Sequence, residues 1–137
     1  MKIEKAILYT DGASRGNPGP SAIGAVIRDG KGGVLARISR RIGKTTNNQA
    51  EYRAIIAALE EARRLGAASV ELRSDSELAV RQINGRYRVK NPALKPLYQR
   101  ARELLSSFQS YTATAIPRRQ NAEADRLSNA ALDRAVD

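Results

Sequence analysis

Hydrophobic and polar residues alternate along three segments in the first third of the chain. Within residues 3–11, Ala6 and Leu8 lie on one face of an extended backbone, and Ile7 and Tyr9 lie on the other. The alternation predicts three strands, over residues 3–11, 23–28 and 34–42. The segments G-A-S-R-G-N-P-G-P-S-A and D-G-K-G-G predict the two turns that join them into an antiparallel meander.

The period changes to that of a helix after the third strand. Residues 46–65 predict a helix with a capping box, because Thr46 can accept from the backbone of Gln49 while the Gln49 side chain reaches back. Gly66 ends this helix. The remaining pattern predicts a strand over 70–74, helices over 76–83 and 93–108, a strand over 111–116 and a helix over 122–136.

The resulting order, βββαβααβα, predicts an α/β fold that forms a single domain over residues 1–137. Right-handed βαβ crossovers make the first, fourth and fifth strands parallel, and the second and third strands join antiparallel at one edge. We therefore expect a five-stranded mixed sheet in the order 3-2-1-4-5, flanked by helices. Ligands of such sheets bind at the carboxyl ends of the parallel strands.

Composition limits the chemistry that this fold can carry. The chain of 137 residues has no cysteine and no histidine. Disulfide scaffolds, thiol nucleophiles, the usual zinc sites and any imidazole-dependent triad are therefore excluded, which leaves carboxylates, hydroxyls or lysine. No apolar run is long enough for a membrane span or a secretion signal, so we expect a cytoplasmic protein that does not bind membranes.

Positive charge is unevenly distributed. The 24 Lys and Arg residues outnumber the 14 Asp and Glu residues, which gives a net charge of +10. Residues 78–102 carry seven cations, no acidic residue and two interleaved tyrosines, Tyr87 and Tyr98. Such a run can be a solvated helix face, but a single sign of charge is what phosphate neutralisation requires.

Two aspartates follow predicted parallel strands. Asp11 is the last residue of the first strand, and Asp75 closes the fourth at an S-D-S junction into a helix. Each also has a structural interpretation, because aspartate is common before a glycine such as Gly12 and can cap a helix. Neighbouring parallel strands end at the same edge of a sheet, so both carboxylates are expected there.

Two more carboxylates lie on predicted helices. Glu51 shares the apolar stripe of its helix with Ile55 and Ala58, so a cation must accompany it, either an arginine or a metal ion. Asp125 lies in the first turn of the last helix, where the helix dipole alone would favour it. Helices packed on the sheet can bring both carboxylates to the strand-end aspartates.

Four carboxylates at one place repel each other and therefore imply divalent cations. An all-oxygen ligand set without imidazole or thiolate points to Mg²⁺ or Mn²⁺. Two such ions roughly 4 Å apart form the clamp used for in-line attack on a phosphodiester. An acidic metal site on a basic protein predicts a nuclease.

Four blocks of the sequence resemble the signature blocks of type 1 ribonuclease H. They are Y-T-D-G-A-S-R-G-N-P-G-P at 9–20, T-T-N-N-Q-A-E at 45–51, S-D-S at 74–76 and P-R-R-Q-N-A-E-A-D-R-L-S-N at 117–129. The resemblance implies that Asp11, Glu51, Asp75 and Asp125 are the catalytic, metal-binding set. It further implies an endonuclease that hydrolyses the RNA strand of RNA/DNA hybrids with two Mg²⁺ ions, Mn²⁺ being a possible substitute, and leaves 5′-phosphate and 3′-hydroxyl ends.

The same resemblance implies the residues that bind the hybrid. Small residues and amides suit close approach to 2′-hydroxyls in the minor groove. The implied minor-groove residues are Gly12, Ala13, Ser14, Arg15, Gly16, Asn17, Asn47, Asn48 and Gln49. Lys44, Thr46 and Asn91 correspond to a pocket for a phosphate of the DNA strand.

The chain departs from the family pattern at two places. Many members have a histidine in the loop before the last aspartate, whereas this chain has Arg118 and Arg119 there, which can stabilise phosphate charge but cannot act as a base near neutral pH. The tryptophan-rich basic protrusion of larger members is reduced to residues 84–93. Arg86, Tyr87, Arg88 and Lys90 are the candidates for a reduced substitute. This form resembles a short subgroup found in some archaea and bacteria.

Glu77 also departs from the pattern, because an amide or apolar residue is commoner at that family position. Pairing of Glu77 with Arg81, one helical turn later, is the interpretation we favour.

Two other functions are alternatives to hybrid cleavage. Integrases, transposases and junction resolvases have similar carboxylate sites on related folds, but the amides that read 2′-hydroxyls favour a hybrid substrate. A non-catalytic module that binds hybrids or RNA would not need all four carboxylates. We expect a monomer with no obligatory protein partner.

Overall fold

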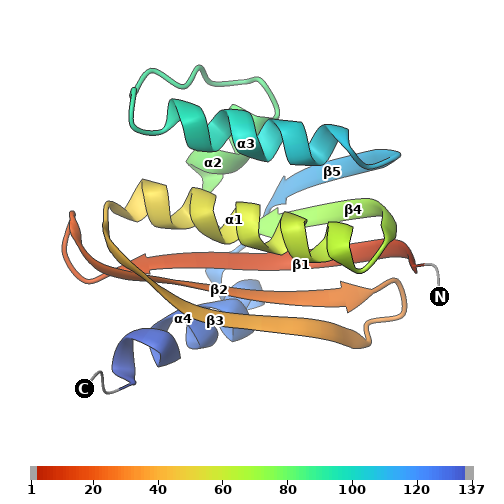
Figure 1. Cartoon of the computed structure of the whole chain (residues 1–137), viewed down its shortest axis with the longest axis horizontal. Coiled ribbons are helices and arrows are strands. Elements are labelled where there is room, and N and C mark those ends of the chain that lie inside the picture. Colours follow the sequence, from red (N-terminus) through yellow and green to blue (C-terminus); the bar gives the residue numbers. More distant parts are fainter. Residues whose placement is uncertain (1–2, 135–137) are drawn as a thin grey trace.

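The computed structural model describes residues 3–134 and contains one five-stranded sheet with helices on both faces (Figure 1). The strands are β1 (Ile3–Ser14), β2 (Gly19–Asp29), β3 (Val34–Thr45), β4 (Ala67–Ser74) and β5 (Ser110–Ala115). The helices are α1 (Asn47–Arg64), α2 (Glu77–Ile83), α3 (Lys95–Ser106) and α4 (Ala122–Asp133), with a short 3₁₀ helix η1 (Arg118–Asn121) before α4. None of the helices within 3–134 is long and apolar enough to cross a bilayer.

The sheet has the predicted strand order, β3-β2-β1-β4-β5. Strand β1 pairs antiparallel with β2 and parallel with β4, and β4 pairs parallel with β5. The predicted order of elements and the five-stranded mixed sheet are therefore confirmed.

Helices α1 and α4 cover opposite faces of the sheet (Figure 1). Successive residues of a strand point to opposite faces. On β2, Ile23 packs in the main core with α1, whereas Ala22 forms a separate small cluster with Ala131 and Leu132 of α4. Helix α3 packs against α1.

The prediction that the first strand ends at Asp11 is wrong, because β1 continues to Ser14. Its antiparallel ladder with β2 runs through Asp11↔Gly24 to Ser14↔Ser21, which leaves only residues 15–18 for the turn. The parallel ladder with β4 does stop at Thr10↔Ser74. Asp11 is therefore inside a strand, yet it still stands at the carboxyl end of the parallel pair.

The second and third strands are also longer than their predicted ranges of 23–28 and 34–42. The register of β2 with β3 shifts between Ser21 and Ala22, where Gly43 has a φ of 82°. This bulge breaks the alternation at Ile42 without ending the strand, and β3 continues to Thr45.

The helix boundaries follow the capping residues. Helix α1 begins after Thr46, which forms the predicted capping box with Gln49, and the left-handed Gly66 (φ 82°) follows its C-cap. Helix α3 is shorter than the predicted 93–108, because Asn91 forms a turn before it. Helix α4 ends at Asp133, and the end of the predicted helix, residue 136, lies outside the described residues.

Candidate active site

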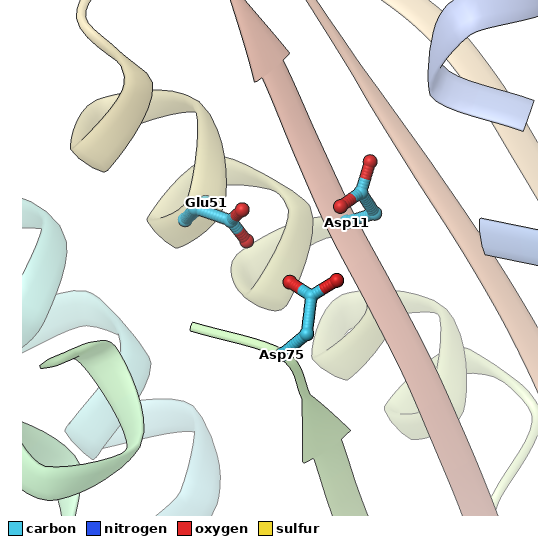
Figure 2. A group of neighbouring side chains, drawn as sticks. All are labelled: Asp11, Glu51 and Asp75. Atoms are coloured by element: carbon cyan, nitrogen blue, oxygen red, sulfur yellow. The ribbon is translucent and has the colours of Figure 1, made fainter. Parts of the chain in front are cut away.

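Three carboxylates from three elements meet at the carboxyl end of β1 and β4. Asp11 is on β1, Glu51 is in the first half of α1, and Asp75 directly follows β4. One carboxylate oxygen from each residue lies within 4.8 Å of those of the other two. Figure 2 shows that the three side chains point toward one another.

Two glycines allow the helices to come close enough to form the site. A Cβ atom on Gly12 would lie 2.2 Å from the backbone carbon of Ala50 and 2.4 Å from the nitrogen of Glu51. On the other face, a Cβ atom on Gly24 would lie 2.2 Å from the backbone oxygen of Ala124 on α4. The side-chain space of Gly12 is therefore filled by α1, and this close packing brings Glu51 beside Asp11.

Burial and like charge raise the pKa of two of the carboxyl groups. Asp11 is 5% exposed and Glu51 is 6% exposed. Desolvation raises the pKa of Asp11 to about 6, and the nearby charges of Asp75 and Asp125 also raise it. Desolvation likewise raises the pKa of Glu51 well above its ordinary value, with Asp11 and Asp75 adding to the rise. These carboxylates therefore lack enough positive charge nearby to compensate them.

Asp125 lies beside the group of three rather than within it. It lines the same hollow of about 210 Å³ as Asp11, Glu51 and Asp75. Its backbone and side chain are held by Asn129, whose Nδ2 lies 3.0 Å from the Asp125 backbone oxygen and 3.3 Å from Oδ1. All four predicted carboxylates thus share one hollow, and three of them form its tight centre.

The two arginines before α4 have different positions. Arg118 lines the carboxylate hollow, and its charge lowers the pKa values of Asp11 and Glu51, although burial outweighs this effect. Arg119 lines a separate hollow with Tyr9 and Arg28. Of the two candidates for the missing histidine, Arg118 is the one that faces the carboxylates.

The predicted minor-groove residues come from two segments that contact each other. Ala13, Ser14 and Asn47 line the carboxylate hollow. The turn after β1 is joined to α1 because Asn17 Oδ1 accepts from the Asn47 backbone nitrogen at 3.1 Å. Exposed residues of these two segments are Arg15, Gly16, Asn17, Asn47 and Asn48. The Gln49 side chain is half-buried and serves the capping box, since its Oε1 accepts from the Thr46 nitrogen at 2.9 Å.

The three residues assigned to a DNA-phosphate pocket lie in different elements. Lys44 is exposed on β3, opposite Pro20, and Thr46 is the N-cap of α1. Asn91 is exposed in the loop between α2 and α3, where its Oδ1 accepts from the Ala93 nitrogen at 2.8 Å. Within the described chain no hydrogen bond joins Asn91 to Lys44 or Thr46.

One further predicted interaction near the site is present. Glu77 pairs with Arg81 at 3.3 Å, as expected. Arg81 also donates to the hydroxyl of Tyr87 at 2.7 Å and stacks over its ring. This contact orders Tyr87, which is 48% exposed, at the start of the basic segment 86–90.

Sequence reasoning missed two residues that support the site. Ser128 is fully buried and its Oγ donates to Asp11 Oδ2 at 2.6 Å. Asn121 is buried and donates to the backbone oxygen of Thr10, next to Asp11, at 2.8 Å. Both belong to the block at 117–129, and the spacing of Ser128, three residues after Asp125 on one helix face, was the available signal.

The residues present fit divalent cations. The donors are all carboxylate oxygens, which Mg²⁺ and Mn²⁺ prefer. Glu51 Oε2 is buried and has no hydrogen-bond partner among the described residues. A buried carboxylate oxygen without a donor is costly unless a cation binds it, so this orphaned atom supports a metal site.

Comparison with known proteins decides the family. A family model described as reverse transcriptase-like matches residues 9–131. Ribonuclease HI of Halobacterium salinarum is 50% identical over 125 residues, which is 91% of this chain and 63% of that protein. The chain belongs to the type 1 ribonuclease H family. The resemblance carried by the four sequence blocks is therefore confirmed.

Solved ribonuclease H structures agree closely with this fold. The crystal structure of RNase H1 from Halobacterium salinarum has a TM-score of 0.93 at 49% identity, covering 96% of this chain and 99% of that one. The structure of LC11-RNase H1 in complex with an RNA/DNA hybrid has a TM-score of 0.89 at 47% identity, covering 93% and 96%. This ribonuclease H domain spans 63% of the length of the curated Halobacterium relative.

Proposed function

We propose that the chain is an endoribonuclease that hydrolyses the RNA strand of RNA/DNA hybrids with two Mg²⁺ ions, Mn²⁺ being a possible substitute. The observation that carries the proposal is the carboxylate cluster, in which the ligand atoms of Asp11, Glu51 and Asp75 lie within 4.8 Å of one another. A relative of 47% identity and the same fold has been solved with such a hybrid. The expected products carry 5′-phosphate and 3′-hydroxyl ends.

The four carboxylates are the proposed metal ligands. Asp11, Glu51 and Asp75 form the centre, and Asp125 lines the same hollow from α4. When bound there, two divalent cations supply the charge that activates water and neutralises the leaving oxygen. The carboxylates supply the negative charge that holds the cations and, being fixed to β1, α1, β4 and α4, set where the scissile phosphate binds.

Substrate reaches the carboxylates through a wider hollow beside them. This hollow of about 660 Å³ shares Glu51, Asp75 and Arg118 with the carboxylate hollow. Arg118 lines both hollows, and its guanidinium, which has only donors, is the proposed contact to phosphate oxygens of the substrate. The chain has no histidine, so no imidazole base is available at this site.

Selection of a hybrid over DNA depends on the residues around the hollow. The backbone and side chains of Ala13, Ser14 and Asn47 lie in the wall of the carboxylate hollow. Amides and hydroxyls can donate to or accept from a 2′-hydroxyl, which DNA lacks. Lys44, at the same end of the sheet, is the proposed contact to the DNA strand. We further propose that the protein acts as a monomer without an obligatory protein partner.

Cleavage of an end-labelled hybrid of about 12 base pairs, roughly one helical turn, tests the proposal directly. The hybrid is incubated with Mg²⁺ beside single-stranded RNA and duplex DNA. We expect cuts in the RNA strand of the hybrid alone. Cuts in DNA would instead indicate an activity like that of the integrases and resolvases.

Asp75→Asn is the control variant for this experiment. It removes one ligand charge but keeps the shape of the side chain, so we expect hybrid binding to persist. Cleavage should fall at least 100-fold, because loss of a group that only orients a metal ligand already costs about 10- to 100-fold. Unchanged turnover in this variant would refute the carboxylate assignment. A wild-type protein that binds the hybrid but never cuts it would be a binding module.

A further inference from the structure

A buried hydroxyl joins helix α4 to the centre of the carboxylate cluster. Ser128 is fully buried, and its Oγ lies 2.6 Å from Asp11 Oδ2 and 2.9 Å from the backbone oxygen of Asp125. A serine hydroxyl has one proton to donate, and the shorter, charge-assisted contact is the one to the carboxylate. Ser128 therefore touches Asp11 directly and Asp125 through the helix backbone.

A glycine in the sheet allows α4 to come close enough for Ser128 to reach Asp11. Gly24 is the residue of β2 that pairs with Asp11 of β1. A Cβ atom on Gly24 would lie 2.6 Å from the Ser128 nitrogen, so α4 passes over the sheet at the closest approach that a glycine allows. Asn121 ties the start of the same segment to Thr10, the neighbour of Asp11. Two contacts thus anchor the α4 segment to β1 at Asp11, one on each side of Asp125.

Asp11 needs such an anchor because its neighbours repel it. The charges of Asp75 and Asp125 act on a carboxylate that is 5% exposed. A carboxylate held by one donor keeps a fixed rotation about its side-chain bonds, and Figure 2 shows one Asp11 oxygen directed toward Glu51 and Asp75. Without the hydroxyl, repulsion favours rotation away from the cluster.

We propose that Ser128 is a positioning residue for cation binding, which fixes the Asp11 carboxylate and links it to the helix that carries Asp125. The inference rests on the proposed function, in that the cations serve hybrid cleavage. Ser128 does not line the carboxylate hollow and has no contact with substrate in this role. Its effect is therefore confined to metal affinity and turnover.

The test compares the wild-type protein with Ser128→Ala, a substitution that suits a helix and removes only the hydroxyl. The first measurement is the shift of Tm on Mg²⁺ titration without substrate. The second is cleavage of the hybrid as a function of Mg²⁺. We expect the half-saturating Mg²⁺ concentration to rise about 10-fold and kcat to fall by about 10-fold, the lower end of the range for groups that orient metal ligands, with KM for the hybrid unchanged.

Ser39→Ala is the matched control. The Ser39 hydroxyl also ties α4 to the sheet, since its Oγ donates to the Leu127 backbone oxygen at 2.6 Å, but it does not touch a carboxylate of the cluster. We expect Ser39→Ala to lower Tm without Mg²⁺ while leaving the Mg²⁺ midpoint unchanged. A variant pair with equal Mg²⁺ midpoints, or an equal rise in both, would overturn the positioning role.

The two measurements separate this inference from the proposed function. If the wild-type protein binds Mg²⁺ but does not cleave the hybrid, the proposed function fails. The difference in Mg²⁺-induced Tm shift between wild type and Ser128→Ala then still decides the role of Ser128.

Discussion

Two carboxylates of this site, Asp11 and Glu51, lie in surroundings that disfavour their charged forms. Asp11 and Glu51 are almost fully buried, and burial together with neighbouring carboxylates raises the pKa of each. Without cations, the charged forms of these two groups therefore destabilise the folded protein, as is common where ligands are arranged for function rather than for folding. The same residues should become stabilising once cations bind.

The pH dependence of stability is expected to reveal this conflict at Asp11. Its pKa is raised from 3.8 to about 6, so the folded state binds the proton more tightly than the unfolded state. The stabilisation is complete below the unfolded pKa and is lost as pH rises through the folded pKa. Without divalent cations, Asp11→Asn should therefore gain roughly 3 kcal/mol over the wild type between about pH 4 and pH 7.

Urea unfolding of both proteins at several pH values measures this difference. Subtracting the two curves cancels carboxyl groups with lowered pKa values, such as Glu71 and Glu123, which lose stabilisation as pH falls. Saturating Mg²⁺ should reverse the order of stability at about pH 7. A difference between the two proteins that does not change with pH would contradict the assigned burial of a charged Asp11.

At the scale of elements, the site depends on two helices pressed onto opposite faces of β1 and β2. Gly12 admits the backbone of α1 at Glu51, and Gly24 admits the backbone of α4 at Ala124. Gly24 of β2 pairs with Asp11 of β1, and Gly12 is the next residue of β1. The close packing of α1 and α4 on the sheet therefore also brings the carboxylates together.

Gly24→Ala should separate α4 from the sheet. The added Cβ would lie 2.2 Å from the Ala124 oxygen, a backbone atom that only a shift of the helix can move. We expect a loss of about 3 kcal/mol in the free energy of unfolding, at the upper end for overpacking, and weaker Mg²⁺ binding. Gly30→Ala is the control, because a Cβ there meets nothing within 4 Å, and its stability should stay within about 0.5 kcal/mol. Equal stability of the two variants would show that α4 is not tightly packed.

The order of elements and the four carboxylates could be predicted because each leaves a local pattern. Capping of α1 by Thr46 and the S-D-S junction at Asp75 are read from a few adjacent residues. The ends of the strands could not be predicted in this way. Strand β1 continues beyond Asp11 because β2 continues to pair with it, and this pairing is not visible in the local sequence. Ser128 was missed for a similar reason, as its partner Asp11 is 117 residues away in the chain.

At the scale of the whole molecule, an acidic centre lies within a strongly basic protein. The net charge is +10, although the centre itself holds Asp11, Glu51, Asp75 and Asp125. The positive field attracts a polyanion from a distance. Under the proposed function, the local negative charge would bind the cations that allow a phosphate to approach. Affinity for the hybrid should therefore fall with salt, with one increment for each phosphate that a cation of the protein neutralises.

The salt dependence of hybrid affinity can test whether Lys44 neutralises one such phosphate. Hybrid affinity is measured at several salt concentrations in the Asp75→Asn background, where cleavage is expected to be at least about 100-fold slower. Lys44→Ala should weaken binding and reduce the slope of log affinity against log salt by about 1, because one fewer counterion is released. Lys31→Ala removes the same charge from the β2–β3 turn, at the opposite end of the sheet. Both variants change the net charge equally, so a long-range field alone would give equal slopes of log affinity against log salt. Equal slopes would rule out the Lys44 contact. A reduced slope in Lys44→Ala alone would place a bound phosphate at Lys44.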